Sequence, residues 1–413
     1  MFLNFLKTRN PAFIDYAVFM LERGLIEIDT YVLDVDAIEH NARRLGDLSQ
    51  KHGLSLYFMS KQLGRNPEIS RRVLEAGKTV SGSQAAGRYG FTGMVAVDFR
   101  EAQILHSAGL PVKHLGHLCQ VPKNSWDAAL DMKSEVITLF SLEKAKELSD
   151  AAERRGLIQG VLLRLVNEGD VFYQGQEGGF PLSTLNETLD LIEKLPGLRV
   201  AGLTAFPCFL YQENEGKSYP TSNAQTVVKG AALLRERGIK EPQLNMPSCN
   251  SLATFPLAAE LGATHLEPGH SLTGTNPDNL NEKDPLTPAL LYMSEISHHF
   301  KDRSFCFGGG YYRRSNLRYA LVKNSGKYEE TSVFAQAPES IDYHLQLAGH
   351  FPSGSPVCMA FRTQIFTTRS RVALVEGLSV SQPKLLGIWD SSGNEVSQGN
   401  EVTRGNFVSR GRS

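Results

Sequence analysis

The residue with the clearest chemical potential in this sequence is Lys61, which ends the apolar run at residues 56–60. A short apolar run of this kind predicts a buried strand. A lysine directed from such a strand into an apolar site loses its proton easily, and its neutral amine is then a nucleophile for a carbonyl group. A lysine after a strand is more often a solvated surface charge, so a chemical role for Lys61 needs support from other residues.

Two polar motifs later in the chain are candidates for an anion site. Residues 247–251 read Pro-Ser-Cys-Asn-Ser, and residues 267–270 read Glu-Pro-Gly-His. Hydroxyls and main-chain N–H groups at the start of a helix can bind an anion. Taken alone, an Asn-Ser pair is more often a helix cap and a Pro-Gly pair is more often a turn. The candidate anion ligands are Ser248, Asn250, Ser251, Gly269 and His270.

The elements that must position these residues alternate between short apolar runs and amphipathic stretches. In one unit, a strand at residues 136–140 is followed by Ser141 as a helix cap, a helical apolar face and Gly156. Repeated units of this kind predict a parallel sheet, and a count near eight favours a closed barrel over an open sheet. We therefore expect an α/β fold with a (β/α)8, TIM-like barrel, in which reacting groups lie where strands end.

Beyond residue 285 the sequence changes to Val, Ile, Thr and Tyr runs separated by Gly-Gly, Ser-Gly and Pro turns. This pattern predicts a second, mainly β domain. We place the barrel at residues 30–284 and the β domain at residues 285–413. Residues 1–29 are expected to be helical at best and to pack with the β domain.

Composition narrows the classes of partner. The 43 basic and 44 acidic residues nearly cancel and form no long run of one sign, so we expect neither a nucleic-acid track nor a membrane surface. Charged residues interrupt the apolar ones before residue 20, so no signal or spanning segment is expected. The cysteines are scattered without a CxxC spacing, which fits a reducing cytoplasm and predicts no zinc cluster.

The segment Tyr-Phe-Met-Ser-Lys-Gln-Leu-Gly at residues 57–64 resembles the strand-to-lysine motif of the fold-type III pyridoxal 5'-phosphate (PLP) enzymes. This is the superfamily of alanine racemase and of ornithine and diaminopimelate decarboxylases. Further similar motifs follow in the same order over nearly the whole chain. The resemblance implies that PLP is held as a Schiff base on Lys61 inside the barrel.

The same resemblance implies roles for the barrel residues. Arg164, in Leu-Arg-Leu, corresponds to a basic residue near the phenolic oxygen of the cofactor. Phe206 stands where the family usually has a histidine against the ring, and an aromatic side chain can still stack there. Glu267 stands where the decarboxylases have glutamate and alanine racemase has arginine against the pyridine nitrogen. The two polar motifs described above would bind the phosphate.

In the second domain, Gly-Gly-Gly-Tyr-Tyr at residues 308–312 resembles the family's Gly-Tyr loop. In alanine racemase this loop supplies the tyrosine that faces the lysine, which makes Tyr311 a catalytic candidate. Pro-Val-Cys-Met at residues 356–359 resembles the loop that holds the substrate carboxylate, so Cys358 and Met359 are substrate-binding candidates. The aspartate that usually follows is Ala360 here, and the nearest charge is Arg362, a third candidate. Because both loops serve the partner's site in the family, the resemblance implies a homodimer with composite active sites.

Taken whole, the sequence is similar to the YhfX-type branch of amino-acid racemases. We therefore expect a PLP-dependent racemase or epimerase that acts at Cα of a small amino acid. The alternatives are a decarboxylase of the same fold and a non-catalytic PLP carrier, although a carrier would have no task for Tyr311. A zinc-assisted lyase also belongs to the superfamily, but His344, His350 and Cys358 lack a metal-ligand spacing, so no metal site is expected.

The first prediction is that Lys61 carries the cofactor, because a single desolvated amine is needed at the end of the first barrel strand. Borohydride reduction of the PLP-loaded protein should fix PLP on Lys61, and Lys61→Ala should lose the long-wavelength absorption of the bound cofactor. Peptide mapping of the reduced protein checks the assignment. Label on another lysine would contradict it.

Overall fold

The computed structural model describes residues 2–78 and 88–398. It divides into two compact units, and residues 399–413, the last part of the expected β domain, lie outside the described residues. The barrel unit comprises Ala42–Ser60 and Ser70–Gly269. The β unit comprises Met1–Asn41, Lys61–Ile69 and His270–Ser413.

The barrel unit contains a closed sheet of eight parallel strands among the described residues. The strands follow one another in chain order, and pairing between the last and the first closes the sheet. In order, they are β2 (Ser55–Met59), β3 (Gly90–Ala96), β4 (Val112–Leu115), β5 (Val136–Leu139), β6 (Gln159–Val166), β8 (Leu198–Thr204), β11 (Gln243–Asn245) and β12 (His265–Leu266). The expected (β/α)8 barrel is confirmed.

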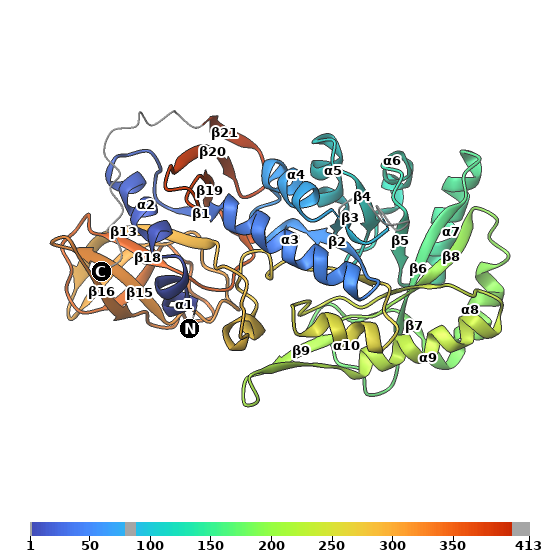
Figure 1. The fold of residues 1–413 in the computed structure, drawn as a ribbon. Helices are drawn as coiled ribbons and strands as arrows, with labels where there is room; N and C mark the ends of the chain where they lie inside the picture. The colour runs from blue at the N-terminus through green and yellow to red at the C-terminus, as the bar shows by residue number, and fades with distance from the viewer. Residues whose placement is uncertain (1, 79–87, 399–413) are drawn as a thin grey trace. The chain divides into compact units, whose positions relative to one another are not determined.

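Helices connect these strands and lie on their outside (Figure 1). In helix α7, Ser141 accepts from the Lys144 N–H and caps the first turn, while Ala145 and Leu148 are buried against the barrel, as the sequence predicts. The helices are α3 (Val35–Lys51), α4 (Pro67–Ala76), α5 (Phe99–Ser107), α6 (Trp126–Asp131), α7 (Leu142–Arg154), α8 (Leu185–Ile192), α9 (Ser222–Glu236) and α10 (Thr254–Glu260).

Shorter elements complete the chain between these helices and strands. The short strands are β7 (Phe180–Pro181), β9 (Phe209–Gln212) and β10 (Lys217–Pro220). The single-turn 3-10 helices are η1 (Ser60–Leu63), η2 (Lys123–Ser125), η3 (Leu182–Thr184), η4 (Pro277–Asn281) and η5 (Ile365–Thr367). None of the helices in the described part of the chain is long and apolar enough to cross a bilayer.

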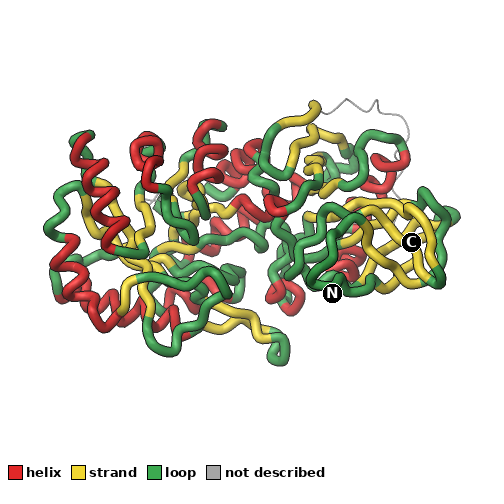
Figure 2. The backbone as a smooth tube through the Cα atoms, turned by 180° about the vertical axis from the view of Figure 1, so that it is seen from behind, coloured by secondary structure: helices red, strands yellow, loops and turns green. Residues whose placement is uncertain are grey.

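The β unit is built mainly of strands, which Figure 2 shows in yellow. Its sheet has the order β16-β15-β18-β13-β1-β19-β20-β21, with β14 and β17 added beyond β13. The strands are β1 (Thr30–Asp34), β13 (Leu290–Phe300), β14 (Arg303–Phe307), β15 (Tyr319–Asn324), β16 (Lys327–Ser332), β17 (His344–Ala348), β18 (Pro356–Met359), β19 (Arg371–Glu376), β20 (Lys384–Asp390) and β21 (Glu395–Gln398). The expected mainly β domain is confirmed.

Two N-terminal helices, α1 (Phe2–Arg9) and α2 (Pro11–Glu22), share a core with this sheet. Leu6 and Phe13 are fully buried there beside Met293 of β13. Because both helices put apolar side chains into the sheet's own core, their packing comes mainly from burial of apolar surface.

Strand β1 falls inside the range 30–284 expected for the barrel, but it pairs in the β unit. It runs antiparallel to β13 and parallel to β19, and all five of its residues are buried. A strand buried on both faces is a continuous apolar run in either kind of sheet, so its sequence does not choose between them. Its partners come from segments far away along the chain.

The second prediction concerns Gly202 in β8, where an added Cβ would lie 1.8 Å from the Gln243 carbonyl oxygen on the paired strand β11. Gly202→Ala must push two barrel strands apart, and we expect it to lower the free energy of unfolding by about 3 kcal/mol. The control is Gly156→Ala, where φ is +64° but no atom lies within 4 Å, so the expected loss is about 1 kcal/mol. Urea unfolding of both variants measures the difference, and equal losses would contradict it.

Candidate active site

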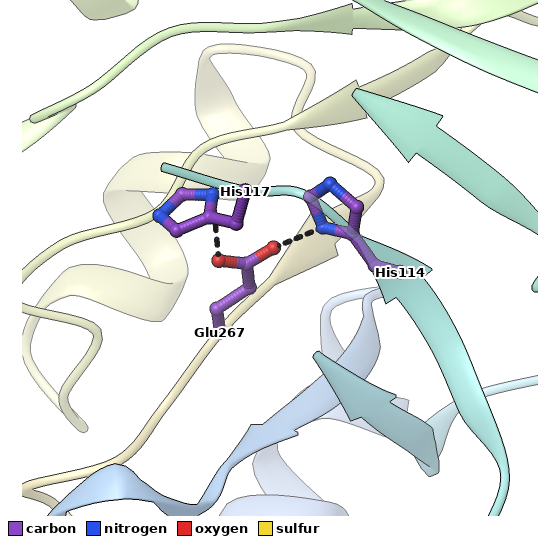
Figure 3. A group of neighbouring side chains, drawn as sticks. All are labelled: His114, His117 and Glu267. Atoms are coloured by element: carbon purple, nitrogen blue, oxygen red, sulfur yellow. Dashed lines mark hydrogen bonds and ion pairs between the residues drawn. The ribbon is translucent and has the colours of Figure 1, made fainter. Parts of the chain in front are cut away.

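Glu267 is a buried carboxylate that directly follows barrel strand β12 (Figure 3). Its Oε1 atom lies 2.6 Å from Nδ1 of His114 and accepts a hydrogen bond of 2.8 Å from Nδ2 of Asn245. Its main-chain N–H donates to Oδ1 of Asn250 at 2.8 Å. The carboxylate is therefore fixed from β4, from β11 and from the loop after β11.

Two histidines flank this carboxylate. His114 belongs to β4, and its Nε2 lies 2.6 Å from the hydroxyl oxygen of Thr138 on β5. His117 lies three residues later, with its Nδ1 atom 3.2 Å from Oε2 of Glu267. The ring of His117 also meets the ring of Phe206 edge to face, with centroids 5.2 Å apart. The rings of His114 and His117 thus lie against Glu267, and Phe206 packs on the ring of His117.

The electrostatics favour an ionised Glu267. Burial raises the pKa of its carboxyl group, but His117 and His114 lower it by more, so that it lies at about 2. Burial, followed by the effect of nearby His114, lowers the pKa of His265 to about 3, so this third histidine is neutral. His117 and then His114 are therefore the neighbours that offset the effect of burial on the pKa of Glu267.

His114, His117 and Glu267 also form a group that could hold a metal ion, since one donor atom from each lies within 4.8 Å of the others. No metal was expected from the sequence. Ligand atoms around one zinc ion lie about 3.4 Å apart, because each is about 2.1 Å from the metal in a tetrahedron. The 2.6 Å between His114 and Glu267 is instead a hydrogen-bond distance.

Sequence reasoning missed both histidines. They stand in the pattern His-Leu-Gly-His at residues 114–117, at the end of a barrel strand. Two histidines three residues apart at such a point are a signal that was present in the sequence. Gly116 has a φ of +79°, which lets the chain turn so that both rings reach the same carboxylate.

Arg164 is the second predicted barrel residue with an unusual environment. It is 1% exposed, its Nη2 atom donates to the Gln176 carbonyl oxygen at 2.5 Å, and its guanidinium lies 4.6 Å above the Phe140 ring centroid. Its Nε and Nη1 atoms have no hydrogen-bond partner among the described residues. Burial lowers the pKa of this guanidinium to about 10.

The barrel unit therefore buries a cation, Arg164, and an anion, Glu267, and each lacks some of its hydrogen-bond partners among the described residues. Oε2 of Glu267 has no hydrogen-bond partner in the described part of the chain. Arg164 and Glu267 both influence the pKa of the buried Cys208 thiol, which is raised chiefly by burial. Unsatisfied buried polar groups are costly and call for a partner. A ligand with an N–H donor and an anionic oxygen would satisfy both.

The predicted anion loop has a distinct backbone between β11 and α10. Ser248 and Cys249 have φ values of +90° and +45°. Asn250 donates to the Met246 carbonyl oxygen at 3.1 Å and accepts from Glu267, so its side chain fixes the loop. The Ser251 N–H donates to the hydroxyl of Thr254 at 2.8 Å. Gly269 ends the barrel unit two residues after Glu267.

Three predicted residues are electrostatically linked within the β unit. The His270 pKa lies well below its usual value, chiefly because of burial and then because of Arg362 and Lys61. The Nε2 atom of His270 has no hydrogen-bond partner among the described residues. Lys61 lies in η1, which follows β2 directly. The chain thus brings Lys61, His270 and Arg362 into one electrostatic group.

The Gly-Tyr loop is held by its backbone. The carboxylate of Asp342 accepts from the N–H groups of Gly309 at 3.0 Å and Tyr311 at 3.1 Å, and it pairs with Arg369 at 3.0 Å. A Cβ atom on Gly309 would lie 1.5 Å from the Asp29 carboxylate, so only glycine fits there. The loop conformation is therefore set by Asp342 and Gly309.

The two tyrosines of this loop differ in their hydrogen bonds. The hydroxyl of Tyr312 accepts from Nε2 of Gln364 at 3.2 Å. Both tyrosine side chains are partly exposed. No hydrogen bond of the Tyr311 hydroxyl is seen in the part of the chain that the structure describes.

The Cys-Met loop is part of the β unit's core. Cys358 and Met359 are fully buried in β18, and the Cys358 sulfur lies 3.6 Å from the Met293 sulfur. Burial chiefly raises the pKa of the Cys358 thiol. Its side chain therefore packs as an apolar group in this structure.

Comparison with known families agrees with this architecture. Residues 33–277 match the model of the alanine racemase N-terminal domain, which is more than half of the chain. The chain belongs to the alanine racemase N-terminal domain family. Residues 291–385 of this family member match the YhfX-like C-terminal domain. The chain is 45% identical over 398 residues to the uncharacterized protein YhfX of Escherichia coli (strain K12), covering 96% of this chain and 100% of that protein.

Solved structures with the same fold are distant in sequence. D-threonine aldolase from Filomicrobium marinum superposes with a TM-score of 0.65 at 15% identity, covering 89% of this family member and 95% of that chain. Alanine racemase from Clostridium difficile 630 gives 0.62 at 16% identity, covering 88% and 98%. D-threo-3-hydroxyaspartate dehydratase from Delftia sp. HT23 gives 0.64 at 15% identity, covering 91% and 97%. These likenesses establish the alanine racemase fold.

The third prediction is that Arg164→Met stabilises the ligand-free protein by about 1 kcal/mol, because an incompletely paired buried cation is replaced by an apolar side chain. The sign follows from the lowered pKa of Arg164, since a cation whose pKa falls on folding destabilises the fold at every pH below that value. Arg303→Met is the control. Arg303 also stacks on a ring, Phe334, and donates to Gln346, but it is half-buried.

Urea unfolding at pH 7 of the ligand-free proteins measures both effects. Arg303→Met should lose stability, because a satisfied arginine is removed. A loss for Arg164→Met as large as that for Arg303→Met would show that Arg164 is satisfied within the chain.

Proposed function

We propose that this protein is a PLP-dependent enzyme that racemises or epimerises an amino acid at Cα. The observation that carries the proposal is the pair of incompletely satisfied buried groups in one barrel, Oε2 of Glu267 and the Nε and Nη1 atoms of Arg164. A protonated pyridine ring with a phenolic oxygen offers one N–H donor and one anionic acceptor. These are the two partners that Glu267 and Arg164 lack.

The remaining contacts to PLP follow the family motifs. Glu267 would accept from the ring N–H, Arg164 would donate to the phenolic oxygen, and Phe206 would contact the ring. Lys61 would bind the cofactor covalently. The phosphate ligands would be Ser248, Asn250, Ser251, Gly269 and His270.

Racemisation needs an acid-base group on each face of Cα. Bound PLP supplies electron withdrawal from the Cα–H bond. Lys61 would exchange the proton on one face and Tyr311 on the other. The hydrogen bond from Gln364 to Tyr312 leaves Tyr311 as the better candidate of the two, because its hydroxyl is not already engaged by Gln364.

We propose that the active form is a cytoplasmic homodimer in which Tyr311 and Arg362 serve the partner's site, and in which Cys358 and Met359, whose side chains are buried, would bind substrate through main-chain groups. An exposed apolar pair supports a contact near the Gly-Tyr loop. Ile341 and Tyr343 are 63% and 65% exposed, and they flank Asp342, which holds this loop. Large exposed apolar side chains of this kind are frequent at interfaces between chains.

Decarboxylation is the second candidate, and the ionised carboxylate at Glu267 favours it, because the decarboxylases of this superfamily carry glutamate there. Decarboxylation needs no tyrosine base and is favoured when the substrate carboxylate lies away from cations such as Arg362. A non-catalytic PLP carrier would not exchange the Cα proton of any amino acid with solvent.

The fourth prediction separates these reactions. The PLP-loaded enzyme is incubated with L- and D-amino acids in deuterated water, and optical rotation, Cα deuteration and carbon dioxide are followed together. We expect loss of optical rotation with Cα deuteration and without carbon dioxide. Tyr311→Phe should lower turnover by about a hundredfold or more, as expected for loss of a general acid-base group.

Tyr312→Phe is the matched control, since it removes a neighbouring hydroxyl that is already bonded to Gln364. It should retain turnover within about threefold of the wild type. Carbon dioxide released in step with substrate loss would replace racemisation by decarboxylation. Equal turnover in Tyr311→Phe and wild type would remove only Tyr311 from the mechanism.

A further inference from the structure

The two carboxylate oxygens of Glu267 have different contacts in the barrel unit. Oε1 is held by two hydrogen bonds, from His114 and Asn245, whereas Oε2 has only the ion pair with His117 at 3.2 Å (Figure 3). Both histidines are buried, with side chains 0% and 2% exposed. A symmetrical site for an ion would engage both oxygens alike. This arrangement clamps one oxygen and leaves the other as an acceptor.

His114 is hydrogen-bonded through both of its ring nitrogens. Its Nδ1 lies 2.6 Å from the Glu267 carboxylate, which only accepts, so Nδ1 must carry a proton. Its Nε2 lies 2.6 Å from the Thr138 hydroxyl, which can either donate to a neutral imidazole or accept from a protonated one. The hydrogen bond to Glu267 therefore exists in both states of His114.

We propose that His114 and His117 are positioning residues: His114 clamps the Oε1 atom of Glu267, His117 pairs with its Oε2 atom, and together they orient Oε2 to accept from the N–H group of a cationic aromatic ring. This inference rests on the proposed function, in which that ring is the pyridine of PLP. His114 and His117 act through Glu267 and need not touch the substrate.

Among the groups packed around Glu267, His114 and His117 are the ones that offset the effect of burial on its carboxylate. Tyr57 of β2 faces the His114 ring with centroids 5.9 Å apart, and burial raises the pKa of its hydroxyl, so it stays neutral. His265 of β12 is held neutral by burial. Without a cation from His114 or His117, burial would favour protonation of Glu267. A protonated Glu267 would no longer attract a cationic ring.

The test compares PLP with an analogue in which carbon replaces the ring nitrogen. Both are titrated into the cofactor-free protein, and binding is followed by absorbance and equilibrium dialysis at several pH values between 6 and 9. The wild type should prefer PLP by about tenfold or more at every pH, as expected for a hydrogen bond between charged groups. Glu267→Gln should lose this preference throughout.

The variants His114→Asn and His117→Asn keep a donor near the position of Nδ1 but cannot carry a charge. In them, burial would raise the pKa of Glu267. We expect the preference for PLP to fall about tenfold at pH 6.5 and to recover as the pH rises and Glu267 ionises again. A purely structural role for the histidines would lower the affinity for both compounds alike, without this pH profile.

Gln243→Leu is the matched control, because Gln243 is a buried polar barrel residue that donates to Tyr57 at 3.2 Å and, within the described residues, makes no hydrogen bond to Glu267. It should keep the wild-type preference at every pH. A flat, unchanged preference in both histidine variants would overturn the inference. Stoichiometric binding of Zn²⁺ alone by the cofactor-free wild type, lost in Glu267→Gln, would also overturn it by making the cluster a metal centre.

These outcomes separate the inference from the function on which it rests. If the wild type binds neither compound and Lys61 is not labelled, the proposed function fails together with the inference. If PLP binds through Lys61 but shows no preference over the analogue, the inference alone fails. Thermal unfolding of each cofactor-free variant checks that the barrel is intact before binding is measured.

Discussion

The burial of one ionised carboxylate is the constraint on which the barrel's functional end depends. Moving a carboxylate out of water is expensive unless it is paired and hydrogen-bonded. Glu267 meets this requirement with His114, His117 and Asn245, which come from different strands and a loop. Closure of the sheet brings these strand ends together, so the fold makes an arrangement possible that no single segment of the chain could supply. The barrel in turn keeps out the water that would weaken each of these charges.

In the β unit, main-chain hydrogen bonds hold the Gly-Tyr loop, without any bond to the hydroxyl of the candidate Tyr311 among the described residues. Asp342 binds main-chain N–H groups on both sides of Gly310, and the carbonyl oxygen of Gly310 accepts from the buried hydroxyl of Tyr31. Satisfied main-chain groups fix the loop's conformation. In the barrel unit, by contrast, side chains fix a side chain, as where His114 and Asn245 bind the Oε1 atom of Glu267. The two units therefore place their functional residues by different means.

Much of the fold was predictable from local pattern. The helix capped by Ser141 lies where its apolar spacing and cap place it, and the repeated strand-helix units close into the expected barrel. Strand β1 could not be assigned correctly, because a strand buried on both faces looks alike in a barrel and in a sandwiched sheet. The sequence pointed to Glu267 and Arg164 through family motifs, and the structure adds that each is incompletely satisfied. His114 and His117 were missed because their importance lies in reaching a residue about 150 positions away, which spacing alone does not reveal.

The way in which Asp342 grips the Gly-Tyr loop has an evolutionary consequence. The loop's path depends on main-chain hydrogen bonds and on the space left by Gly309, and no hydrogen bond of the Tyr311 hydroxyl is among those that hold it in the described part of the chain. A single codon change at Tyr311 would therefore exchange the group presented there while the scaffold keeps its conformation. When the residues that hold a loop are not the ones that it presents, a single substitution can change the presented side chain and the protein still folds.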